Sequence, residues 1–205
     1  MPRNRSDDAG VRQRSRPDPA AADHRNDRAG EIYCDKFGEI SSDIDTARLL
    51  EGVSEIQLTA RLKNTPAIIV QGRSDTLLPV NETSRAYYGK NQLTQIGATQ
   101  LRYIEVTNGQ HFDTFIDLLP GFSQLYIPVH VYLQRALNAM YDHLKNGTPL
   151  PPSQVVRTTP RGPVTPPFTT LVATPITAAN VPPISPNPLA GDLIQMQKTT
   201  LLIPD

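Results

Sequence analysis

The sequence has a single cysteine, no tryptophan and no long apolar run. One cysteine, Cys34, excludes an internal disulfide and a cysteine-based zinc site. No stretch approaches the roughly 18 apolar residues of a membrane span, and the first residues lead into charge instead of an apolar export signal. We therefore expect a soluble chain without an export signal of its own, which leaves cytoplasmic, periplasmic and extracellular locations open.

Net charge is also absent. Twenty Lys and Arg balance twenty Asp and Glu, so no global field attracts a nucleic acid or an anionic membrane, and we expect neither as a partner. Metal-ligand spacings such as H-E-x-x-H and Gly-rich phosphate loops are missing as well. We therefore expect neither a metal nor another cofactor.

Proline, by contrast, is abundant and divides the chain into three parts. The 20 prolines are about twice the usual share, and they crowd the segment 148–205, which predicts an extended tail. Residues 1–40 combine Arg, Asp, Pro and Ala with few large apolar side chains, which predicts a disordered leader. The folded part is therefore expected at 41–147.

Periodicity in this middle part predicts alternating helices and strands. Short apolar runs bounded by proline or glycine indicate buried parallel strands, and apolar residues at helical spacing indicate helices. The predicted elements are a helix from Asp43 to about Lys63-Asn64, a strand at 67–70, a helix from Asn81 to about Asn91 that stops at Gly89, a strand at 101–106, and a long helix ending at Gly147. We expect an α/β fold.

The long helix is the clearest of these elements. Pro128 suits its first turn, and Gly147 suits the position just past its end. Seven residues are predicted to share one face of it: Ile127, Val131, Gln134, Leu137, Met140, Tyr141 and Leu144.

Two side chains in the loops after the predicted strands suit acid–base chemistry. Asp75 follows the first strand and His111 follows the second, in the order in which α/β-hydrolases present the acid and the base of their triad. His24 falls in the leader, and His130 and His143 fall in the long helix. Because a turn aspartate and a solvated histidine are common, the spacing alone leaves a purely structural role open.

A serine nucleophile is not recognisable. A nucleophile elbow needs G-x-S-x-G, because the flanking glycines allow a sharp turn from strand to helix. Ser54 lies in Gly-Val-Ser-Glu-Ile and Ser123 in Gly-Phe-Ser-Gln-Leu, and both segments lack the second glycine. An oxyanion-hole loop has no candidate either.

Four segments, taken together, resemble the D-(-)-3-hydroxybutyrate oligomer hydrolase family. They agree in order and spacing from about residue 45 to the C-terminus, and they read TPAIIVQGRSDTLLPVNETSR from Thr65, LRYIEVTNGQHFD from Leu101, PVHVYLQRAL from Pro128 and PPSQVVRT from Pro151. The resemblance implies the last strands and helices of an α/β-hydrolase fold. It also implies a serine-type carboxylesterase that cuts 3-hydroxybutyrate oligomers to monomers during poly(3-hydroxybutyrate) breakdown.

Carried onto this sequence, the family pattern makes Asp75 the acid and His111 the base. Family members are longer and have their serine upstream, while residues 1–40 do not resemble them. We therefore expect this chain alone to be inactive and to need a separate N-terminal half. A non-catalytic remnant or accessory binding domain is one alternative, and a tannase-like or feruloyl-esterase-like hydrolase is another.

Overall fold

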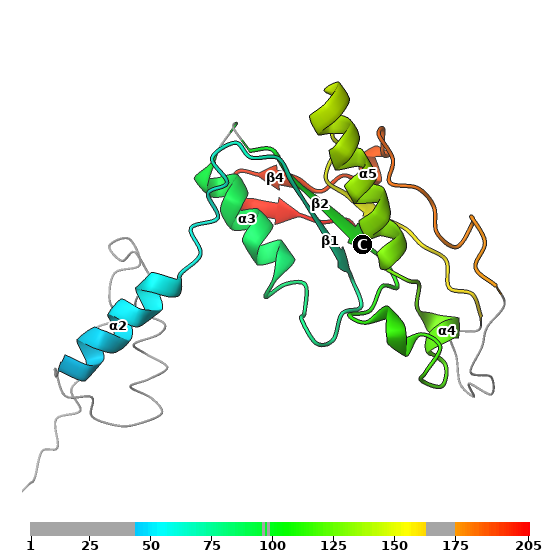
Figure 1. Cartoon of the computed structure of the whole chain (residues 1–205), viewed down its shortest axis with the longest axis horizontal. Helices are drawn as coiled ribbons and strands as arrows, with labels where there is room; N and C mark the ends of the chain where they lie inside the picture. Colours follow the sequence, from blue (N-terminus) through cyan, green and yellow to red (C-terminus); the bar gives the residue numbers. More distant parts are fainter. Residues whose placement is uncertain (1–43, 96, 98, 163–174) are drawn as a thin grey trace, which may run out of the picture. The chain divides into compact units, whose positions relative to one another are not determined.

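A computed structural model of the chain describes residues 44–95, 97, 99–162 and 175–205, which fall into two units, Met1–Leu58 and Thr59–Asp205 (Figure 1). The predicted leader therefore lies outside the described residues, as do positions 163–174 of the predicted tail. Within the described ranges, no helix combines the length and the apolarity that crossing a membrane requires.

The described part of the first unit contains helix α2, Ile44–Ile56. Our prediction that this helix runs to about Lys63-Asn64 was wrong. Ala60, Lys63 and Asn64 have φ angles of 56°, 49° and 63°. These left-handed values interrupt an α-helix, so the chain after Ile56 becomes irregular.

The second unit is built on a parallel three-stranded sheet in the order β1-β2-β3. β1 (Ala67–Gly72) pairs with β2 (Leu101–Val106), and β2 pairs with β3 (Gln154–Val156). The α/β class and the two predicted parallel strands are confirmed. We did not predict β3, because a three-residue strand among prolines leaves no periodic signal.

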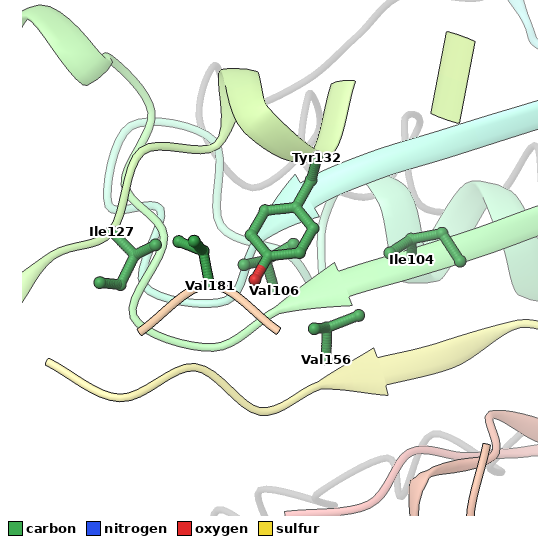
Figure 2. Packing of buried hydrophobic residues seen from close by; sticks show 6 residues of the cluster. All are labelled: Ile104, Val106, Ile127, Tyr132, Val156 and Val181. Atoms are coloured by element: carbon green, nitrogen blue, oxygen red, sulfur yellow. The ribbon is translucent and has the colours of Figure 1, made fainter. Parts of the chain in front are cut away.

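Alternate residues of β2 are buried on opposite faces of the sheet. On one face, Ile104 and Val106 pack against Tyr132 of helix α5, His130–Asn146, in a cluster that also includes Ile127, Val156 and Val181 (Figure 2). On the other face, Leu101 and Tyr103 pack with Tyr88 of helix α3, Ser84–Thr94. The sheet is thus covered on both sides, as parallel sheets usually are.

Parts of the predicted tail belong to this core. Val155, Val156, Val181 and Ile194 are all buried, and the guanidinium of Arg135 donates hydrogen bonds to the carbonyls of Val181 and Pro182. Beyond them lie η2 (Ala190–Asp192) and an antiparallel hairpin of β4 (Gln195–Gln197) and β5 (Thr200–Leu202), which contacts α3. These tail segments therefore complete the fold instead of following it.

Two helix ends also differ from the prediction. α3 continues through Gly89 to Thr94, and the side-chain amide of Asn91 in its last turns donates to the carbonyl of Ala60. α5 begins at His130 and not at Ile127, because Ile127 forms a bridge with Gly109. Its end at Gly147, with φ of 72°, is confirmed.

The apolar face predicted for the long helix is not the face that packs on the sheet. Tyr132 and Ala136 are the buried residues of α5. Leu137, Tyr141 and Leu144 are 59%, 59% and 69% exposed. α5 therefore has a second apolar surface that turns away from the core.

Candidate acid–base site

Asp75 and His111 meet at the carboxyl ends of β1 and β2. Nδ1 of His111 lies 2.9 Å from Oδ2 of Asp75. An ionised carboxylate only accepts hydrogen bonds, so Nδ1 carries the hydrogen, and in the neutral ring the lone pair is then on Nε2. The side chains are 5% exposed for Asp75 and 25% exposed for His111. The acid is thus enclosed, while the imidazole reaches solvent.

The loop after β1 holds the Asp75 carboxylate in its ionised form. Oδ1 accepts hydrogen bonds from the backbone N–H groups of Leu77, at 3.0 Å, and Leu78, at 2.9 Å. Burial raises the pKa of the Asp75 carboxyl, but the bonds from Leu78, His111 and Leu77 outweigh it, so the net pKa is lower than usual. Gln71 closes the loop by donating to the Leu78 carbonyl.

The loop after β2 is supported by the chain beyond β3. Asn108 has φ of 56°, and its side-chain amide donates to the carbonyl and hydroxyl oxygens of Thr158. The backbone N–H of Thr107 donates to the carbonyl of Val156, and that of Thr158 donates to the Thr107 hydroxyl. The predicted tail therefore helps to hold the turn that carries His111.

A pair of glycines lets the two loops approach. A Cβ on Gly72 would overlap the carbonyl carbon and oxygen of Gly109. A Cβ on Gly109 would lie 2.8 Å from Cα of Gly72 and 2.7 Å from a methyl group of Val129. The loops are also joined by a hydrogen bond from the Ser74 N–H to the Gly109 carbonyl. We recognised Gly72 only as the boundary of a strand, because a contact between distant glycines has no sequence signal.

A buried ion cluster lies beneath the acid loop. Glu105 of β2 is fully buried, and its carboxylate accepts hydrogen bonds from Arg73 at 2.5 Å, Arg85 at 2.6 and 2.8 Å, and the Tyr103 hydroxyl at 2.6 Å. Burial raises the pKa of Glu105, but Arg85, Tyr103 and Arg73 reverse this effect, so the net pKa is lowered. Arg73 is two residues before Asp75, so the cluster ties the acid loop to β2 and α3.

A second aspartate–histidine pair connects the site to α5. Asp113 begins the short helix η1, Asp113–Phe115, and its carboxylate accepts the N–H groups of Val129, at 2.8 Å, and His130, at 2.7 Å. It also lies 2.8 Å from Nδ1 of His130. Such bonds satisfy donors at a helix start. Asp113 therefore fixes α5 against the loop that carries His111.

An open pocket of about 280 Å³ adjoins His111. Its lining is mostly apolar and comes from β1, the His111 loop and the first turns of α5: Val70, His111, Phe112, Asp113, Thr114, Val129, His130 and Leu133. The volume is near the lower end of the roughly 300–1,000 Å³ seen for small-molecule sites. A small, largely apolar ligand would suit this pocket.

The two serines considered above lie outside this arrangement. Ser54 is in α2, where its hydroxyl donates to the carbonyl of Glu51. Ser123 is fully buried in helix α4, Phe122–Leu125. Neither follows a strand, as a nucleophile elbow requires.

His143 lies away from the site, because its Nδ1 is bonded to the Thr148 carbonyl at the far end of α5. Within the described ranges, no three His, Cys, Asp or Glu side chains gather as metal ligands.

The geometry suits proton transfer at Nε2 of His111. A carboxylate placed in this way can orient the ring and stabilise an imidazolium formed when Nε2 takes a proton. This pairing is what a serine, cysteine or water nucleophile needs from a general base. The described residues thus provide an oriented base beside a small apolar pocket.

Comparison with known proteins assigns the chain to a family. A family model described as 3HB-oligomer hydrolase (3HBOH) matches residues 4–205, a range that includes most of the leader we had expected to be unrelated. A D-(-)-3-hydroxybutyrate oligomer hydrolase of Cupriavidus metallidurans is 53% identical over 157 residues, which cover 77% of this chain and 21% of the relative. Proteins of the same name from Ralstonia pickettii and an Azoarcus species are 54% and 52% identical, over 76% of this chain and 20% and 22% of their own lengths.

This chain thus spans about a fifth of the length of the curated relatives it matches. No solved structure matches it. The family match over nearly the whole sequence confirms the resemblance that the four segments indicated. The chain belongs to the 3HB-oligomer hydrolase family.

Proposed function

We propose that this chain supplies the acid and the base of a serine-type catalytic triad that hydrolyses D-(-)-3-hydroxybutyrate oligomers to monomers. The observation that carries the proposal is the 2.9 Å contact between Nδ1 of His111 and Oδ2 of Asp75, at adjacent strand ends and beside a pocket. The names of the relatives support the substrate class. The nucleophile and the oxyanion donors are assigned to the larger part of the relatives' sequence that this chain does not span.

The reaction would proceed through an acyl-enzyme. Nε2 of His111 takes the proton of the serine hydroxyl while the serine oxygen bonds to the ester carbonyl carbon. When the carbon–oxygen bond breaks, Nε2 gives this proton to the leaving alkoxide, which departs as a shorter hydroxybutyrate. Water then attacks the acyl carbon, and the same nitrogen accepts a proton from water and returns it to serine. Throughout, Asp75 holds Nδ1–H and fixes the ring.

A chimera provides the experiment. The segment of the C. metallidurans relative that matches this chain would be replaced by the corresponding residues of this chain, so that the relative supplies everything else. Hydrolysis of the 3-hydroxybutyrate dimer would then be followed by release of monomer. We expect Asp75→Asn to lower kcat by about 10⁴, and His111→Ala by at least as much.

Matched variants separate this effect from a loss of folding. Asp192→Asn removes a partly exposed carboxylate that pairs with Arg157, and His143→Ala removes an imidazole at the other end of α5. Both should leave kcat within about twofold, since surface substitutions away from a site have small effects. Turnover near normal in Asp75→Asn or His111→Ala would remove that residue from the proposed triad.

A further inference from the structure

One face of α5 is apolar and open to solvent along nearly the whole helix. Leu133, Leu137, Tyr141 and Leu144 are 52%, 59%, 59% and 69% exposed. At 3.6 residues per turn these positions fall within one narrow stripe of the helix, because they are four, four and three residues apart. We call these four side chains the α5 stripe.

The α5 stripe is separate from the face that holds the helix on the sheet. Tyr132 and Ala136 make the core contact, with Tyr132 fully buried between α5 and the strands (Figure 2). A helix that is apolar on two faces is normally covered on both. Contiguous exposed apolar surface of this kind marks an interaction site.

The stripe runs into the candidate site. Leu133 is its first residue and also lines the pocket beside His111. Phe112 lines the same pocket, is 49% exposed, and stacks edge-on against the His111 ring with centroids 4.3 Å apart. A protein segment that covers the stripe would therefore lie next to the pocket that His111 lines.

We propose that the α5 stripe is the docking surface for the remaining part of the hydrolase, the part that carries the nucleophile. This inference rests on the proposed function. Two facts favour this occupant. The chain spans about a fifth of its relatives, so most of a hydrolase lies outside it. The stripe also leads to the base that a nucleophile must reach, within hydrogen-bonding distance of about 3 Å.

Thiol labelling with a maleimide tests the proposal. The rate of labelling is compared between this chain alone and the chimera described above. Cys34 is changed to serine in every protein, and a cysteine is introduced by Tyr141→Cys in the stripe or by Asn138→Cys, at an exposed polar position of the same helix. We expect the maleimide to react with residue 141 at least about tenfold more slowly in the chimera than in the chain alone. Residue 138 should react within about twofold in both.

A charge placed in the stripe gives a second measurement. Leu137→Lys should leave the unfolding of the isolated chain nearly unchanged, because the side chain is 59% exposed. In the chimera it should lower the unfolding midpoint, because the ammonium would be buried against an apolar surface. Asn138→Lys has the same charge and should change neither protein. His111→Ala should abolish hydrolysis without affecting the labelling, so a failure of the proposed chemistry is distinguishable from a failure of docking.

Two results would overturn the proposal. The first is equal labelling of residue 141 in the chimera and in the chain alone, with Leu137→Lys harmless in both. The second is protection of residue 141 in the isolated chain that increases with its concentration, together with sedimentation as a dimer. That second result would assign the stripe to another copy of this chain.

Discussion

Gly72 and Gly109 allow the sharpest test of how the acid–base site is assembled. In Gly72→Ala the new methyl group would overlap the carbonyl group of Gly109. Because the obstructing atoms belong to the backbone, no rotamer change relieves the overlap, and the two loops must separate. Overpacking costs about 1–3 kcal/mol, and we expect about 3 kcal/mol here. Separation of the loops also pulls Asp75 away from His111.

Gly89→Ala is the matched control. Gly89 lies inside α3, and a methyl group there would meet only a carbon of Leu201, at 3.9 Å, which is ordinary contact. Alanine is favoured over glycine in a helix by about 0.5–1 kcal/mol. The same chemical change should therefore stabilise the protein at Gly89 and destabilise it at Gly72.

Urea unfolding of the 205-residue chain, followed by circular dichroism, measures both effects. With a slope of about 1–3 kcal/mol per molar urea, a loss of 3 kcal/mol lowers the midpoint by about 1–3 M. A methyl group in Gly109→Ala would press on Cα of Gly72 and also on a methyl group of Val129. Because both single variants separate the same two loops, the double variant should cost less than the sum of the two single variants. A midpoint for Gly72→Ala equal to that of the unchanged chain would refute the close-approach argument.

The remaining predictions concern the buried carboxylates. Glu105→Gln should lower the free energy of unfolding by about 3–5 kcal/mol in the same assay, because it leaves the guanidinium groups of Arg73 and Arg85 without their buried carboxylate. Asp192→Asn, at a partly exposed ion pair, should lower it by at most about 1 kcal/mol. Losses of similar size in the two variants would contradict this prediction. Folding lowers the pKa values of Asp75 and Glu105. Both carboxylates therefore stabilise the folded state at pH values above their ordinary pKa of about 4, and this stability is lost as the pH falls through their pKa values in the folded protein. Unfolding at pH 2–6 should therefore show a shallower acid decline in Asp75→Asn, and an unchanged decline would count against that lowered pKa.

Local patterns in the sequence were sufficient to predict the centre of the fold. A β-branched run between Pro66 and Gly72, and the alternating segment from Leu101, predicted two parallel strands, because strand formation follows from side-chain type and period. Gly147 predicted the end of α5 for a similarly local reason, since glycine adopts the left-handed conformation that ends a helix. Asp75 and His111 were predicted as a pair from their places after these strands.

Other features were decided only by the tertiary structure, because they depend on contacts between distant residues. β3 forms because Val155 and Val156 are buried against β2, although the segment is flanked by Pro151, Pro152 and Pro160. The face of α5 that packs on the sheet is chosen by the fit of Tyr132 against Ile104, while the apolar α5 stripe stays exposed. Helical periodicity reports that a face is apolar, but it does not report which apolar face meets the sheet. The distance between the acid and the base was likewise set by Gly72 and Gly109, two small residues whose contact exists only after the sheet has formed.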